Sequence, residues 1–267
     1  MIAEAADFAA ECEALYALLA PLDDADFARE TQFKHWTIHD VLCHLHMGDF
    51  SAKQTLTDPA AYMEARTKRR AATDAGETLF DYQRRWAGDL SGKRLLESWR
   101  ASAAETAATY ANADPKQRVE WVGPPMSARS SITARLMETW SHSQAIYDLL
   151  GKEREETDRI RAIAHLGAIT YGWTFANRGE DPPGPAPYVR LDAPSGAIWE
   201  WNTERAGDGD SVQGPAVAFC QVVAQTRNFA DTNLKAEGPC ASAWMAQAQC
   251  FAGPPNDPPA PGSRFKQ

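Results

Sequence analysis

Apolar residues recur at helical spacing through the first two-thirds of the chain. The first such segment, residues 3–19, has the i, i+3/i+4, i+7 spacing of an amphipathic helix, with apolar residues at Phe8, Cys12, Leu15 and Leu19. Pro21 and the aspartates after it end this helix. Similar patterns predict five further helices, over residues 36–56, 78–90, 92–113, 131–151 and 157–179. A bundle of helices is therefore expected for this part of the chain.

The pattern changes after residue 179. Residues 180–187, EDPPGPAP, form a linker rich in proline and glycine, which is typical of a domain boundary. Residues 188–202 predict two strands around a DAPSG turn, and an apolar helix, a strand and another helix are expected after them.

The fold class predicted from these patterns is α+β. We expect a helical domain over residues 1–179 and a small α+β domain over residues 186–253. A loose, proline-rich tail is expected over residues 254–267.

Two helix starts have side-chain signals. Thr37 is followed three residues later by Asp40, which resembles a capping box with Asp in the usual Glu position. Ser130 or Ser131 is a natural N-cap for the helix that follows.

Charge argues against nucleic acid as the main partner. The 267 residues carry a net charge of -9, whereas phosphate binding needs a concentrated basic surface. The longest basic run is Lys68-Arg69-Arg70, which acidic residues surround, so we interpret it as a solvated helix face.

No segment indicates a membrane. The N-terminus lacks a basic region, and no stretch approaches the roughly 18 apolar residues of a membrane span. We expect a soluble, cytoplasmic protein, with a monomer as the simplest state. The five cysteines contain no CxxC pair, so a disulfide framework or a cysteine zinc site is not expected.

The candidate chemistry begins with Glu138 and His142, which are four residues apart on an apolar helix. Residues at i and i+4 share one helix face, and imidazole nitrogen and carboxylate oxygen are ordinary zinc ligands. The alternative is a hydrogen-bonded pair at the surface, which is the commoner role of this spacing.

A third ligand can come from the helix at residues 36–56, which carries three histidines. His44 lies three residues after Val41, near the apolar stripe. His46 is about 200° further round the helix, and His39 falls in the exposed first turn. We select His44, for which a buried, structurally satisfied histidine is the alternative interpretation.

These segments resemble a known family. The segments HWTIHDVLCHL and ARLMETWSHSQAIYDLLG resemble the two metal motifs of DinB-like bundles, particularly the mycothiol-dependent maleylpyruvate isomerase N-terminal domain. The resemblance continues into the second domain and covers nearly the whole chain. It implies an up-and-down, four-helix-type bundle with a divalent metal, such as zinc, held on its inner face by His44, Glu138 and His142. Ala145 departs from the aspartate that many relatives have at that position, whereas Asp148 is kept.

The chemistry that the resemblance implies is thiol-dependent. A low-molecular-weight thiol would be the co-substrate and a small, anionic electrophile the substrate, in a cis–trans isomerisation or a thiol S-transfer. Arg227 matches an arginine of the family's C-terminal domain and is a candidate catalytic residue, with Arg129 as the second. A structural ion pair is the alternative role of each arginine.

Other functions remain open from the sequence. The same three ligands permit a hydrolase in which the metal activates water. A metal-containing protein that binds a small ligand without turnover is the third possibility.

Overall fold

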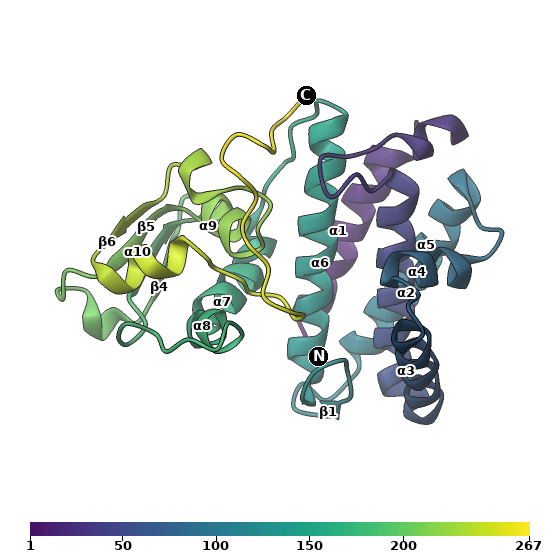
Figure 1. The fold of residues 1–267 in the computed structure, drawn as a ribbon, viewed down its shortest axis with the longest axis horizontal. Helices are drawn as coiled ribbons and strands as arrows, with labels where there is room; N and C mark the ends of the chain where they lie inside the picture. The colour runs from purple at the N-terminus through teal and green to yellow at the C-terminus, as the bar shows by residue number, and fades with distance from the viewer. The chain divides into compact units, whose positions relative to one another are not determined.

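The computed structural model describes all residues, 1–267, and contains two compact units (Figure 1). The first unit is Met1–Leu149 and the second is Leu150–Gln267. No helix of the structure has the length and apolar character needed to cross a membrane.

The first unit is a bundle built on four long helices. Helices α1 (Glu4–Leu19), α2 (Ile38–Thr57), α5 (Gly92–Ala111) and α6 (Ala128–Leu149) pack against one another (Figure 1). Two further helices, α3 (Pro59–Asp74) and α4 (Leu79–Ala87), lie between α2 and α5 in the chain, and a short hairpin, β1 (Arg118–Val119) and β2 (Met126–Ser127), precedes α6. The helix α3 was not among the elements predicted above, because its mostly polar sequence buries only Tyr62.

The predicted apolar stripes form the core of this bundle. The side chains of Phe8 and Leu15 on α1, Trp99 on α5 and Trp140 on α6 are all fully buried. Burying aromatic and leucine side chains stabilises the bundle by roughly 1.5–3 kcal/mol each. The helices that carry the candidate ligands are therefore held by a continuous core.

The capping box predicted at the start of α2 is present. The Thr37 hydroxyl accepts a hydrogen bond from the Asp40 backbone N–H at 3.2 Å, and Asp40 accepts from the Thr37 N–H at 2.9 Å. Burial opposes ionisation of Asp40, but hydrogen bonds from Arg84 and Thr37 outweigh it and lower the pKa of this carboxyl. At the start of α6, in contrast, Ser127 accepts from the Ser130 N–H, so the capping side chain precedes the two serines predicted for that role.

A buried ion pair joins α2 to α6. Arg135 Nε donates to Asp49 Oδ1 at 2.8 Å, and Trp99 donates to the other Asp49 oxygen at 3.0 Å. Asp49 is fully buried. Gly48 leaves room for this pair, because a Cβ there would lie 2.6 Å from an Arg135 nitrogen. This contact explains a glycine inside α2, where glycine costs about 1 kcal/mol relative to alanine.

The second unit combines a four-stranded sheet with helices. The strand order is β4 (Ile198–Trp201), β3 (Tyr188–Asp192), β5 (Ser211–Pro215), β6 (Lys235–Glu237). The β3–β4 hairpin is antiparallel, as the sequence predicted, whereas β3 and β5 are parallel. The helices are α7 (Arg161–Ile169), α8 (Tyr171–Ala176), α9 (Ala216–Val223) and α10 (Pro239–Met245).

The boundary between the units falls about 30 residues earlier than the linker at residues 180–187 suggested. Helix α7 packs on α9, and Gly167 approaches Phe219 and Val223 so closely that a Cβ would lie 2.8 Å from each of them. The residues of α7 and α8 therefore belong with the sheet, although their helical pattern resembles that of the bundle.

The C-terminal residues are tied to the second unit, which corrects the expectation of a loose tail. Arg264 donates to the Gln225 carbonyl oxygen at 2.6 Å, and Arg178 pairs with Asp257 at 2.9 Å. Asn256 donates a hydrogen bond to Gln225. Proline-rich composition removes backbone donors, but it does not prevent side chains from anchoring the segment.

Candidate metal centre

Three side chains converge between α2 and α6. His44 Nε2 lies 3.0 Å from Glu138 Oε2, and His142 Nε2 lies 3.2 Å from the same oxygen. The ligand atoms of the three residues all lie within 4.8 Å of one another, so one ion can contact all of them. The structure thus brings together the three residues selected from spacing and from the resemblance.

The other histidines of α2 face elsewhere. His46 is buried beside Trp86, with its ring 5.0 Å away, and its Nε2 lies 3.2 Å from the Ser98 hydroxyl. His39 lies 3.3 Å from the Cys43 sulfur and is half-buried, so the expected exposure in the first turn was overstated.

An aromatic wall covers one side of the site. The ring of Trp36 stacks on His142 with 5.6 Å between centroids and an interplanar angle of 4°, and Phe33 meets the same imidazole edge-on at 4.9 Å. Between them, Lys34 and His35 have φ values of 52° and 58°. This left-handed backbone, unfavourable for residues other than glycine, turns the loop so that both aromatic rings reach His142. Trp36 is therefore part of the site.

The ionisation states suit a cation. Burial alone would raise the pKa of Glu138, but hydrogen bonds from His142 and His44 outweigh it and hold that pKa well below its ordinary value. Burial and the neighbouring His44 lower the pKa of His142 to about 4, despite the attraction of Glu138. At neutral pH the site therefore offers a carboxylate and a neutral imidazole, which are the forms that bind metals.

Sequence reasoning missed Gln83, the side chain that contacts His44 from behind. Gln83 lies on α4, is 2% exposed, and its carboxamide is 2.9 Å from His44 Nδ1. When His44 Nε2 is a metal ligand, its Nδ1 carries the proton and needs an acceptor. A carboxamide turned through 180° supplies that acceptor with Oε1. No spacing rule connects α4 to His44, since 39 residues separate the two side chains.

Gln83 provides the first testable prediction. We expect Gln83→Leu to weaken zinc binding about 10–100-fold, because the imidazole loses the partner that fixes its tautomer and orientation. Gln83→Glu keeps an acceptor at the same place and should retain most of the affinity. Zinc affinity is measured by competition with a chromogenic chelator. Equal affinities for the leucine and glutamate variants would contradict this role.

Neither candidate arginine is among the three converging residues, and Arg227 lies in the second unit. Arg129 is on α6, nine residues before Glu138 and so about 13 Å along the helix axis, and it pairs with Glu4 at 3.6 Å. Arg227 is half-buried in the second unit, where it donates to the Thr226 carbonyl oxygen at 3.0 Å. Asp148, one of the positions noted above, is buried and accepts from Gln144 at 3.0 Å.

The fold and the site define a class of protein: a helical bundle with two imidazoles and one carboxylate on its inner face, followed by an α+β unit. Residues 8–147 match the family described as the mycothiol maleylpyruvate isomerase N-terminal domain, and the chain belongs to that family. Two uncharacterized Mycobacterium tuberculosis proteins, from strains CDC 1551 / Oshkosh and ATCC 25618 / H37Rv, are each 37% identical to it over 250 residues. The match spans 94% of this chain and 95% of each relative.

The similarity to solved structures extends over both units. The crystal structure of the mycothiol-dependent maleylpyruvate isomerase matches with a TM-score of 0.56 at 15% identity, covering 89% of this chain and 94% of that one. A mutant of that isomerase matches with a TM-score of 0.53, covering 82% and 86% of the two chains. At this identity the likeness establishes the shared fold.

Proposed function

We propose that this protein is a metal-dependent enzyme that uses a thiol co-substrate on a small, anionic, unsaturated acid. The observation that carries the proposal is the convergence of His44, Glu138 and His142, whose ligand atoms lie within 4.8 Å of one another. Membership of the isomerase family supports the thiol as co-substrate.

The donor set fits a divalent ion. Two imidazole nitrogens and one carboxylate oxygen are three protein ligands, the usual number at a catalytic zinc, which leaves a position for an exogenous group. Nitrogen and oxygen ligands also suit other divalent metals, and zinc is the ion we propose to test first. When bound, such an ion supplies a Lewis acid that lowers the pKa of a coordinated thiol.

The surrounding side chains define what the protein itself contributes. Glu138, anionic at neutral pH, balances the charge of a cation, and Gln83 holds the His44 ring in place. Trp36 and Phe33 shield the His142 face from water. A reduced number of water molecules strengthens the electrostatic interactions inside the site.

The reaction follows from the nucleophilicity of a thiolate. Its sulfur forms a bond to the β carbon of the unsaturated acid, and the electron pair of the double bond moves toward the carboxylate. Rotation about the resulting single bond and departure of the same thiolate give the other geometric isomer. If the α carbon takes up a proton and the C–S bond persists, the product is a thioether and the activity is a thiol S-transfer.

A thiol-dependence assay tests this proposal. The zinc-loaded protein is incubated with an unsaturated diacid and a thiol, such as maleate with a cysteine-derived thiol, and the products are followed by NMR. We expect isomerised acid or thioether only when protein, metal and thiol are all present. Arg227→Gln, tested as the candidate anion partner, should lower turnover and leave the metal content unchanged. Conversion of the diacid without any thiol, such as its hydration by metal-activated water, would contradict the proposal.

A further inference from the structure

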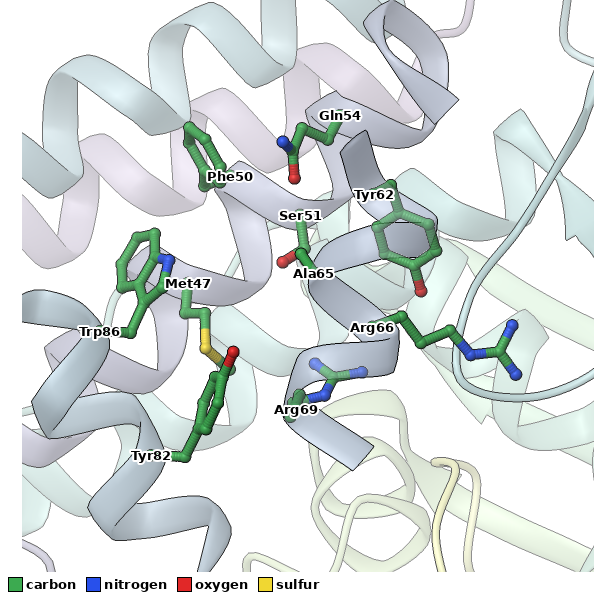
Figure 2. A pocket seen from close by; sticks show the side chains of 10 residues that line it. All are labelled: Met47, Phe50, Ser51, Gln54, Tyr62, Ala65, Arg66, Arg69, Tyr82 and Trp86. Carbon is green, nitrogen blue, oxygen red and sulfur yellow. The ribbon is translucent and has the colours of Figure 1, made fainter. Parts of the chain in front are cut away.

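A pocket lies between α2, α3 and α4 in the first unit (Figure 2). Its cavity volume is about 80 Å³, and its mouth is open to solvent. Only part of a small organic molecule fits this volume, so an occupant would extend into the open mouth. None of the three candidate metal ligands lines it.

The two sides of this pocket differ in chemistry. Met47, Phe50 and Trp86 form an apolar wall, whereas Ser51, Tyr62 and Arg69 supply polar groups on the other side (Figure 2). Burial raises the pKa of Tyr62, and the charge of Arg69 opposes that rise, so the guanidinium and the phenol are close neighbours. An occupant that fits both sides has an apolar body and an anionic end.

Arg69 differs from the other members of its basic run. Lys68 pairs with Glu64 at 2.6 Å and Arg70 with Asp74 at 3.8 Å, both on the solvated face of α3 predicted from the sequence. Arg69 forms no ion pair within 4 Å and lines the pocket instead. A half-buried arginine without a carboxylate partner has guanidinium donors that can bind an external anion.

The pocket adjoins the metal centre along two helices. On α2, Met47 lies one turn after His44, and on α4, the pocket residue Tyr82 is next to Gln83, which contacts His44.

We propose that this pocket binds a small unsaturated or aromatic carboxylate, with the carboxylate on Arg69 and the apolar body against Trp86, Phe50 and Met47. Binding of the acid needs no metal. The acid would also be the substrate, and the pocket its subsite in the enzyme. This second claim alone rests on the proposed function.

The experiment titrates metal-free protein with cinnamate by isothermal calorimetry and uses cinnamamide as the neutral control. We expect a Kd on the order of 0.1–1 mM for the acid. The amide should bind at least about tenfold more weakly, because a charged hydrogen-bond partner contributes a factor of about 10–100. Arg69→Gln should weaken cinnamate by about tenfold or more, and Arg69→Lys should restore part of that loss. The matched control is Arg70→Gln, which removes the neighbouring charge and should leave the Kd unchanged.

Each result decides the inference. Three results would overturn it. The acid and the amide could bind equally, or Arg69→Gln and Arg70→Gln could lose the same amount of cinnamate affinity. The third is no binding of cinnamate at 10 mM, roughly tenfold above the weakest expected Kd. If the zinc-loaded protein proves active but Arg69→Gln leaves KM for the acid unchanged, the substrate role fails and the proposed function stands. If cinnamate binds through Arg69 in a protein that shows no thiol-dependent turnover, the pocket stands and the proposed function fails.

Discussion

Replacing His142 by alanine is expected to strip the metal from this protein while leaving the bundle folded. Sharing a zinc-binding free energy of roughly 12 kcal/mol among three ligands gives about 4 kcal/mol for each, or about a thousandfold in affinity. The fold should persist, because alanine has a high helix propensity and the His142 imidazole lies at the candidate metal centre, outside the apolar core. Elemental analysis of purified protein, with circular dichroism for helix content, measures both effects.

The controls for this prediction come from the same two helices. His44→Ala should lose the metal as well, because it removes an equivalent nitrogen ligand. His39→Ala removes a half-buried histidine of α2 that lies outside the group and should keep about one equivalent. Full metal occupancy in His142→Ala would show that the ligand assignment is wrong. Absence of metal from the wild type, even after reloading, would reduce the three residues to a hydrogen-bonded cluster.

The second large effect is expected at the buried ion pair of Asp49 and Arg135. Asp49→Ala should destabilise the protein by about 3–5 kcal/mol, because it leaves a guanidinium buried without its counter-ion. Arg135 is one turn before Glu138 on α6, so the same change should also loosen the metal centre. Urea unfolding of metal-free protein measures the loss of stability without the contribution of bound metal.

A double variant separates the charge from the packing. Asp49→Leu combined with Arg135→Met removes both charges and should recover much of the stability, since apolar groups of similar volume often replace a buried pair without loss. Glu13→Gln is the surface control: it breaks the exposed pair with Arg100 and should change the unfolding midpoint little. If Asp49→Ala and Glu13→Gln have similar effects, the buried pair is not important for stability.

Features set by neighbours along the chain were predictable from the sequence. The spacing of Glu138 and His142 places them on one face of a helix, because the turn of an α-helix repeats every 3.6 residues. The capping box of Thr37 and Asp40 and the β3–β4 hairpin follow from residues within a few positions of each other. The choice of His44 used the same periodicity on α2.

Only the tertiary structure decided the features that join distant segments. Gln83 reaches His44 across 39 residues, and Arg135 meets Asp49 across 86, so neither partner leaves a mark in the local pattern of the other. The early unit boundary arises in the same way, since α7 has a helical pattern like the bundle's but buries its apolar face against α9. Local periodicity determines which side of a helix is apolar. Packing decides which distant side chain contacts that side. It also places Arg69 in a pocket, whereas its neighbours Lys68 and Arg70 form surface ion pairs.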